Sequence, residues 1–336
     1  MGLGANNMIL NKTIEIAIST YNRSSILESW INNNYKQCAE IGIGLSIYDS
    51  STNDETEKIV TTINDKNILP KIKYVRKESS IRVDEKVLLS IIESSADFVW
   101  PLGDSNSINF TDVENKVLPF LQKDYDFVCV FGNTRLDNDS KTYTRPIDFL
   151  GDCFWHATWL GGIVFNKRIF SPLKNKEMYE TMLHKYNRND GFSYLGIFFE
   201  LIADRKIQAA FTVIKTDSTI GRNKVQGWLK RYMEVWCDNL VYFVDSIPEY
   251  YNAQKDKVLK ETWQILDLDG IWSYKARLAG GLNKEIYEHY DRLGYIDRVL
   301  EDKTRIRRFA TLPMPFVKPY YFVIRIIKKI ARWKNK

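Results

Sequence analysis

The sequence predicts an α/β protein in which a mostly parallel sheet, flanked by helices, is followed by a helical region. In the first 110 residues, short apolar runs alternate four times with helix-like stretches. Such alternation with short connections is typical of parallel strands joined by right-handed crossovers. Beyond about residue 220, apolar residues recur at helical spacing instead. With 336 residues, 44% of them hydrophobic, the chain is long enough for two domains.

The elements follow from these apolar patterns, taken in chain order. We expect strands at residues 14–19, 43–48, 71–76, 98–102, 125–131 and 207–214. We expect helices at residues 24–39, after Asp54, at 83–95 and at 192–203. The fourth strand is almost continuously apolar from Phe98 to Leu102, which is typical of a strand covered on both faces.

Polar residues follow three of these strands at the point where each strand ends. They are Thr20-Tyr21-Asn22-Arg23, Asp49, and the stretch from Gly103 to Asn106. Ligands of parallel sheets lie in the crevice outside the carboxyl ends of the strands. Asp104 and Asn106 present two oxygen-bearing side chains at i and i+2, which suits a hard divalent cation. The alternatives are an ordinary turn at Asp104 and a helix cap at Asp49.

Three motifs together resemble those of family 2 glycosyltransferases, in order and in spacing, over roughly residues 12–215. They are Thr20-Tyr21-Asn22-Arg23, Asp49-Ser50-Ser51 and Trp100-Pro101-Leu102-Gly103-Asp104-Ser105-Asn106. The resemblance implies a GT-A fold. The sequence departs from the family at Asn106, where an aspartate is usual, so that only Asp104 supplies a carboxylate.

The resemblance also implies roles for individual residues. The nucleotide-binding residues would be Thr20, Tyr21, Asn22, Arg23, Asp49, Asp84 and Asp104, with Asp49 near the base. Asp104 and Asn106 would hold Mn²⁺ or Mg²⁺ against the diphosphate of the donor.

The second half of the resembling region would build the acceptor site. Trp155, His156 and Trp159 are the acceptor-binding candidates, although a histidine among aromatic residues also suits a structural role. Asp190, just before a predicted helix, is our candidate for the catalytic base. Asp152 and Glu200 are the competing candidates, and a helix cap is the structural alternative for Asp190.

The function implied is an inverting glycosyltransferase. It would move a sugar from a nucleotide-diphosphate donor, a UDP-sugar, to a hydroxyl of a glycan, glycolipid or glycoconjugate, in bacterial surface polysaccharide synthesis. One alternative is a non-catalytic carbohydrate- or partner-binding module that kept the fold. Another is a nucleotidyltransferase, although residues 19–25 lack the glycines of a phosphate loop.

The basic residues are concentrated at the end of the chain. Residues 303–336 hold 11 of the 48 Lys and Arg residues and none of the 42 Asp and Glu residues. The rest of the chain is therefore mildly acidic, which argues against a dedicated nucleic-acid binder.

The chain ends in a predicted amphipathic helix. Pro313, Pro315 and Pro319 are expected to break the chain before this helix, in which one apolar stripe is formed by Val323, Ile326, Ile327 and Ile330. We expect this basic amphipathic helix to dock on an anionic membrane surface, or else on protein, including a second copy of the chain.

The expected organisation has four parts. Residues 1–11 would be a flexible start, of which Met1–Asn7 resemble residues added for expression; residues 12–220 the GT-A catalytic domain; residues 221–312 a helical domain; and residues 313–336 the tail helix. Four widely spaced cysteines and the absence of a long apolar run lead us to expect a cytoplasmic protein, peripheral at the inner face of the cell membrane.

Overall fold

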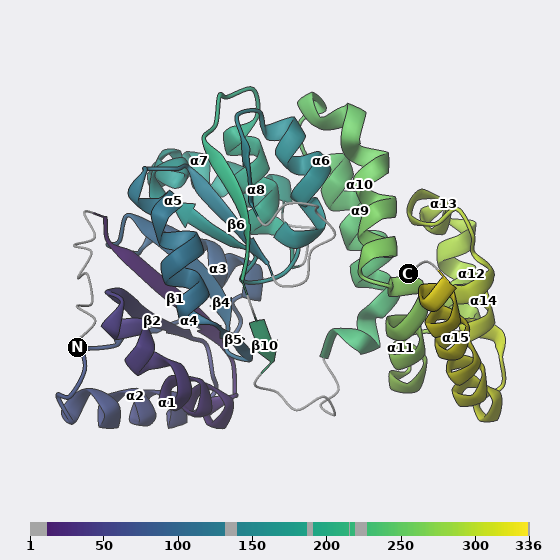
Figure 1. Cartoon of the computed structure of the whole chain (residues 1–336), viewed down its shortest axis with the longest axis horizontal. Coiled ribbons are helices and arrows are strands. Elements are labelled where there is room, and N and C mark those ends of the chain that lie inside the picture. The colour runs from purple at the N-terminus through teal and green to yellow at the C-terminus, as the bar shows by residue number, and fades with distance from the viewer. Residues whose placement is uncertain (1–11, 132–139, 187–190, 215, 219–226, 335–336) are drawn as a thin grey trace. The chain divides into compact units, whose positions relative to one another are not determined.

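The computed structural model describes residues 12–131, 140–186, 191–214, 216–218 and 227–334 (Figure 1). The chain divides into two compact units. The first comprises Met1–Lys185 with Ser193–Asn223, and the second comprises Tyr186–Phe192 with Lys224–Lys336. The first unit contains the strands and the second is helical.

The first unit is built on an eight-stranded sheet with the strand order β3-β2-β1-β4-β8-β6-β9-β7. The strands are β1 (Ile14–Thr20), β2 (Ile43–Asp49), β3 (Lys73–Arg76), β4 (Phe98–Gly103), β6 (Phe127–Phe131), β7 (Ser140–Tyr143), β8 (Ile163–Asn166) and β9 (Ala209–Val213). Of the seven pairings, four are parallel, namely β1 with β2, β1 with β4, β2 with β3, and β6 with β9. The predicted α/β architecture with a mostly parallel sheet is confirmed.

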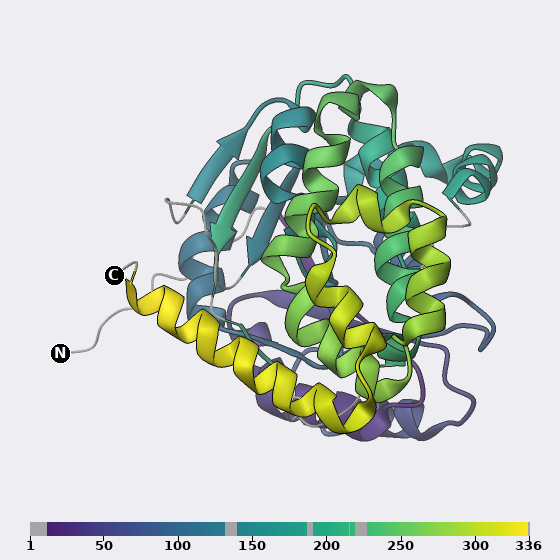
Figure 2. The ribbon, with the colours of Figure 1, turned by 90° about the vertical axis from the view of Figure 1, so that its right-hand side faces the viewer.

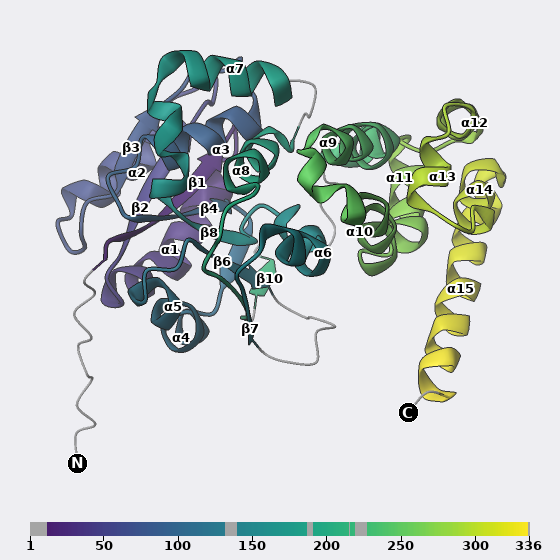
Figure 3. The same ribbon diagram turned by 90° about the horizontal axis from the view of Figure 1, so that it is seen from above.

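Helices cover both faces of this sheet (Figure 3). One face carries α1 (Ser24–Glu40), α2 (Glu55–Asp65), α4 (Phe110–Asp112), the π-helical turn Val113–Val117 and α5 (Leu118–Gln122). The other carries α3 (Val83–Ile92), α6 (Pro146–Ala157), the 3₁₀ helix Lys167–Lys174, α7 (Lys176–Tyr186) and α8 (Ser193–Ile202). The central strands β1, β2 and β4 are largely apolar on both faces because both faces are covered.

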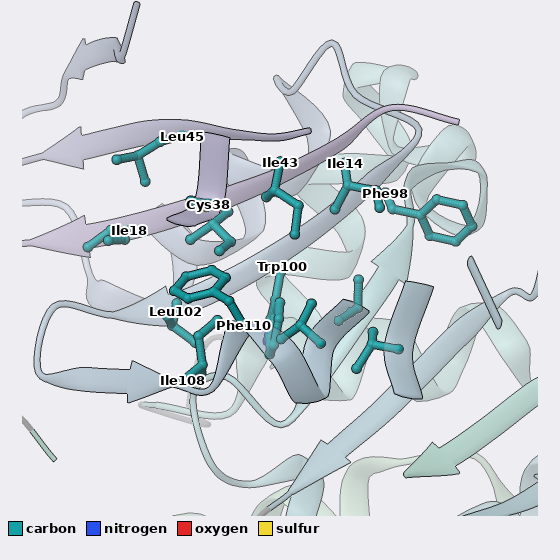
Figure 4. Close-up of a cluster of buried hydrophobic side chains, with 14 of the residues drawn as sticks. Ile14, Ile18, Cys38, Ile43, Leu45, Phe98, Trp100, Leu102, Ile108 and Phe110 are labelled. Atoms are coloured by element: carbon teal, nitrogen blue, oxygen red, sulfur yellow. The ribbon is translucent and has the colours of Figure 1, made fainter. Parts of the chain in front are cut away.

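Alternate residues of the central strands form the core under α1 (Figure 4). The labelled members are Ile14, Ile18, Cys38, Ile43, Leu45, Phe98, Trp100, Leu102, Ile108 and Phe110. Full burial of each large apolar side chain contributes roughly 1.5–3 kcal/mol. Because side chains alternate along a strand, a one-residue slip would move this whole set to the opposite face of the sheet, away from α1. The core therefore fixes the register of β1, β2 and β4.

That register brings the carboxyl ends of four strands together. Thr20 pairs with Asp49, Asp49 with Arg76, and Ser19 with Gly103. Because β2 and β3 lie on one side of β1 and β4 on the other, the strand order reverses between β1 and β4. Such a switch point is where open α/β sheets bind ligands. Beyond β4, β5 (Asn106–Ile108) forms a separate antiparallel pair with β10 (Thr216–Ser218).

The second unit is helical, as predicted. Its elements are the 3₁₀ helix Gly227–Arg231, the π helix Glu234–Asn239, α9 (Leu240–Ser246), the 3₁₀ turn Glu249–Tyr251, α10 (Asn252–Ile265), the π-helical turn Leu268–Trp272, α11 (Ser273–Ala279), α12 (Lys284–Arg292), α13 (Tyr295–Val299), α14 (Thr304–Thr311) and α15 (Met314–Lys334). Tyr232 and Trp263 are fully buried, so that the aromatic stripe of this region builds its core.

The last helix, α15, lies within the predicted range 313–336, but it includes two of the three prolines that we expected to precede it. Pro315 lies in its first turn, where a missing N–H costs little, and Pro319 lies within it. Its first two turns are anchored, since Val317 is buried and Tyr321 stacks on Tyr274 with ring centroids 4.1 Å apart. Figures 2 and 3 show the remainder continuing past the other helices of this unit. Within the described residues, no helix is long and apolar enough to cross a membrane.

Candidate functional site

The turn after β1 is tied to the turn after β2. Asn22 adopts a left-handed backbone conformation with φ of 50°, which asparagine tolerates better than most residues. Its backbone N–H donates to Ser51 Oγ at 2.7 Å, and its side-chain oxygen accepts from the Thr52 N–H at 2.9 Å. Tyr21 and Arg23, on either side of Asn22, remain about half exposed, at 48% and 40%. They form the accessible rim of the site.

Asp49 is enclosed at the end of β2. Its Oδ1 accepts hydrogen bonds from the backbone N–H and the hydroxyl of Ser51. Its Oδ2 accepts from the Tyr74 hydroxyl at 2.9 Å and from Arg76 Nη1 at 3.2 Å. Burial raises the pKa of Tyr74 to about 12, so this hydroxyl stays protonated and continues to donate. The carboxylate is fully buried, and it holds the turn after β2 in shape.

Lys86 lies behind the strand ends with its side chain only 2% exposed. From α3, its Nζ donates to the Thr20 carbonyl oxygen at 2.6 Å and to Ser50 Oγ at 2.7 Å. Burial lowers the pKa of Lys86 to about 8, and the charges of Asp49 and Asp104 oppose that shift. At neutral pH this side chain therefore carries a positive charge between two carboxylates.

Asp104 follows β4, beside the end of β1, and is also 2% exposed. Its Oδ1 lies 2.8 Å from Arg23 Nη1, and its Oδ2 accepts from the Thr20 hydroxyl at 3.1 Å. Burial raises the pKa of Asp104, while Arg23, Thr20 and Lys86 act in the opposite direction. Thr20, Arg23 and Asp104, predicted separately from two motifs, thus meet at the switch point of the sheet.

Asn106 has a different environment from that of Asp104. Its side-chain Nδ2 donates to the Leu160 carbonyl oxygen at 3.0 Å. Since a carbonyl only accepts, the amide must present its nitrogen there. The Asn106 backbone carbonyl accepts from the Trp30 indole at 2.5 Å. Asn106 therefore ties the turn after β4 to α1 and to the loop that contains Leu160.

Asp84 is buried at the start of α3. Its carboxylate accepts from Arg82 Nε at 3.1 Å and Arg82 Nη2 at 2.6 Å, and from the Ser193 backbone N–H at 3.2 Å. Arg82 Nη2 also donates to Ser193 Oγ at 2.7 Å. These contacts join the amino ends of α3 and α8. Of the predicted nucleotide-binding residues, Asp84 is the one whose carboxylate links two helices.

The acceptor candidates lie largely in the core. Trp155 is 7% exposed, and His156 is fully buried against Phe211, with ring centroids 4.7 Å apart. Burial lowers the pKa of His156 to about 3, so that the ring is neutral at physiological pH. Trp159 is half-buried, and of the three it is the one with appreciable exposure for stacking on a sugar.

The base candidate Asp190 lies outside the described residues. Both of its competitors are ion-paired. Asp152 pairs with Lys141, and Glu200 lies 2.6 Å from Lys185 Nζ.

Lys86 and Arg76 are site residues that the sequence analysis did not identify. Arg76 could have been found, because it ends the predicted strand 71–76, which pairs with the strand that ends at Asp49. Lys86 carries a weaker signal. It lies beside Val87 in an apolar helix, where a lysine ordinarily extends into water.

Comparison with known proteins finds solved structures that are similar to this chain. The sequence matches no family model and no curated protein. Residues 1–349 of S. aureus TarS in complex with UDP-GlcNAc are 12% identical, with a TM-score of 0.47, covering 88% of this chain and 90% of that one. The mannosyltransferase PcManGT from Pyrobaculum calidifontis, in complex with GDP-Man and Mn²⁺, is 12% identical, with a TM-score of 0.45 and 85% of each chain covered.

Glucosyl-3-phosphoglycerate synthase from Mycobacterium tuberculosis, in complex with Mn²⁺, UDP and glucosyl-3-phosphoglycerate, is also similar. It is 13% identical, with a TM-score of 0.45, covering 71% of this chain and 82% of that one. The function proposed for this chain therefore rests on its own residues.

Proposed function

We propose that this chain is an inverting glycosyltransferase that binds a nucleoside-diphosphate sugar at the carboxyl ends of β1, β2 and β4. One observation carries the proposal: Thr20, Arg23 and Asp104 meet at the point where the strand order reverses. That is the ligand-binding position of open α/β sheets. The guanidinium there is half-exposed, as binding to a phosphate requires.

The nucleoside would lie over the rim formed by the turns after β1 and β2. Tyr21 offers an exposed aromatic face on which a base can stack. Asn22 and Ser51 shape the floor beneath it. Because the Asp49 carboxylate is saturated by Ser51, Tyr74 and Arg76, we assign to it the positioning of this floor.

The reaction proposed needs no covalent intermediate. A carboxylate base takes the proton of an acceptor hydroxyl, whose oxygen attacks the anomeric carbon from the side opposite the diphosphate. Asp190 remains our candidate for that base. Trp159 is the candidate for sugar stacking, while Trp155 and His156 would support it from the core. The donor is proposed to be a UDP-sugar and the acceptor a hydroxyl of a surface glycan or glycolipid.

We further propose that α15 keeps the enzyme at an anionic membrane surface. Phe316, Phe322, Val323 and Ile326 are exposed by 44–64% along this helix. The sequence around them is rich in lysine and arginine and lacks acidic residues. Exposed apolar residues combined with positive charge are characteristic of helices that lie in the interface of a bilayer. Lipid-linked acceptors would then be close at hand.

Turnover of a nucleotide-sugar panel, measured as release of nucleoside diphosphate with and without acceptor glycans, tests the enzymatic proposal. Asp104→Asn is expected to remove most turnover and to leave the fold intact, because the amide no longer holds the Arg23 guanidinium by charge. Asp65→Asn, at an exposed position at the end of α2, is the matched control and should behave as wild type.

Binding of a donor or glycan without turnover of any donor would favour a non-catalytic module. Release of pyrophosphate from a nucleoside triphosphate would instead indicate a nucleotidyltransferase. Wild-type turnover by Asp104→Asn would show that the Asp104 carboxylate has no role in turnover.

A further inference from the structure

The Asp104 carboxylate is already paired with a cation. Arg23 Nη1 lies 2.8 Å from Oδ1, and the Thr20 hydroxyl donates to Oδ2. A Mn²⁺ or Mg²⁺ ion binds carboxylate oxygens at a little over 2 Å. An ion at Oδ1 would meet the guanidinium and be repelled by it. Arg23 and a divalent cation therefore compete for the same carboxylate.

Asn106 does not supply the missing carboxylate. Its amide nitrogen is held by the Leu160 carbonyl, and its amide oxygen is a neutral ligand that adds no negative charge to the site. A Cβ built on Gly103 would lie 3.1 Å from that nitrogen, so the amide is packed closely over the turn. In the part of the chain that the structure describes, no group of three or more His, Cys, Asp or Glu side chains is placed to hold a metal. The residues present do not fit the divalent cation that the resemblance implies.

The same residues do fit a phosphate. The Arg23 Nη1 atom is held by Asp104, while Nε and Nη2 have no partner among the described residues and the side chain is 40% exposed. A guanidinium held at one corner presents its remaining N–H groups in a fixed fork, which matches two phosphate oxygens. Arg23 also directly precedes Ser24, the first residue of α1, where the helix dipole favours an anion.

The charges of the surrounding groups also favour a phosphate over a divalent cation. Asp49, Asp104 and the exposed Asp54, which lies 4.0 Å from Arg76 Nη2, contribute three negative charges, and Arg23, Arg76 and Lys86 contribute three positive ones. Asp104 itself lies near two of these cations, Arg23 and Lys86, without any added ion. Lys86 is buried and does not reach a ligand, but its charge lies behind the ends of β1 and β2.

We propose that Arg23, oriented by Asp104, binds and stabilises the departing diphosphate in place of a divalent cation, so that this chain works without Mn²⁺ or Mg²⁺. The inference rests on the proposed glycosyl transfer. In that step a bond forms between the acceptor oxygen and the anomeric carbon, while the bond from that carbon to the phosphate oxygen breaks. The electron pair stays on the diphosphate, where Arg23 balances the new charge, and the acceptor proton passes to the carboxylate base. Arg23 is thus a catalytic residue and Asp104 a positioning residue.

Calorimetric titration of the full chain with UDP, and separately with GDP, tests this inference in EDTA and again with excess Mn²⁺. We expect one of the two to bind in EDTA with an affinity that Mn²⁺ changes less than about threefold. Loss of charge-assisted hydrogen bonds in Arg23→Ala should weaken binding about 10- to 100-fold under both conditions. Arg23→Lys keeps the charge but lacks the forked N–H groups, so its affinity should lie between those of wild type and Arg23→Ala.

The matched control is Arg205→Ala, which removes an exposed arginine of the same unit. Thermal unfolding of each variant establishes that it is folded. Binding that requires Mn²⁺, or that is unchanged in Arg23→Ala, would overturn the inference. If such Mn²⁺-dependent binding accompanies sugar transfer, the proposed glycosyl transfer stands and only the metal-free role of Arg23 is wrong. Metal-free binding that depends on Arg23, with no transfer from any donor, would instead overturn the proposed function. If neither nucleotide binds under either condition, both proposals are wrong.

Discussion

Lys86 is the residue whose placement most affects the electrostatics of the site. This lysine is 2% exposed, and two hydrogen bonds and two nearby carboxylates offset the loss of its hydration. Its pKa of about 8 lies close to physiological pH, so a small rise in pH removes its positive charge. Above that pH the site loses a positive charge, and the affinity for a nucleoside diphosphate should fall with it.

The lowered pKa of Lys86 also predicts how stability depends on pH. Between about pH 8 and its ordinary value of 10.5, the unfolded chain keeps the proton that the folded chain has released. The free energy of unfolding must therefore rise with pH in this window, by up to about 3 kcal/mol. Urea unfolding at pH 7 to 10.5 should show this rise for wild type and its absence for Lys86→Met. Lys58→Met, at an exposed position on α2, should keep the wild-type slope. Parallel curves for wild type and Lys86→Met would show that folding does not lower the pKa of Lys86.

The contrast between Asp104 and Lys86 shows what the sequence can predict at this scale. Asp104 follows an apolar strand, and strand ends gather at one edge of the sheet, so its position near Thr20 follows from topology. The burial of Lys86 depends instead on how far α3 is rotated against β1. A helical pattern defines an apolar face only to within a residue or so, and Lys86 lies at the margin of that face.

The loop Thr158–Gly162 is the element that supports the turn after β4. The Trp100 indole N–H donates to the Gly161 carbonyl oxygen at 2.8 Å, and Asn106 donates to the Leu160 carbonyl oxygen. Gly162 makes the close approach possible, since a Cβ built there would lie 2.1 Å from the His156 carbonyl oxygen. The strand end that carries Asp104 is therefore positioned in part by a loop more than 50 residues away in sequence.

Gly162→Ala is expected to be strongly destabilising, by about 2 kcal/mol or more, because the added methyl group meets backbone that cannot yield cheaply. Gly44→Ala is the control, since a Cβ there would lie 3.6 Å from the nearest atom, an ordinary contact. Chemical unfolding of both variants measures the difference. Equal midpoints would contradict the close packing of this loop.

Some elements could not be predicted from the pattern of apolar residues. β7 has three exposed residues out of four and lies at the edge of the sheet, so it lacks the apolar run that identifies an interior strand. β5 and β10 are three residues each, and they pair across more than 100 positions. Their pairing depends on tertiary contacts rather than on local preference. The longer interior strands β1, β2, β4, β6 and β9 were predicted because burial on both faces makes them apolar throughout.

At the scale of the whole molecule, α15 combines an anchored start with exposed apolar residues farther along the helix. Val317, Tyr320 and Tyr321 hold its first turns against α11 and α14. Phe322, Val323 and Ile326 follow, exposed by 64%, 51% and 44%. A truncation that removed the whole helix would also remove the anchoring residues. A sharper test changes only the exposed apolar residues.

The variant Phe322→Ser/Val323→Ser/Ile326→Ser is expected to lose most binding to anionic vesicles and to keep its thermal stability. Apolar burial and basic charge act together at such a surface, with about 1 kcal/mol per nearby basic residue. Co-sedimentation with phosphatidylglycerol-containing vesicles at low salt measures the loss, and neutral phosphatidylcholine vesicles should bind neither protein. The control Ile68→Ser/Leu278→Ser/Leu293→Ser removes three residues exposed by 52–79% elsewhere in the chain and should bind as wild type does. Equal binding by the α15 variant would exclude the membrane role. If light scattering instead shows a wild-type dimer that this variant dissociates, the exposed face of α15 docks on a second copy of the chain.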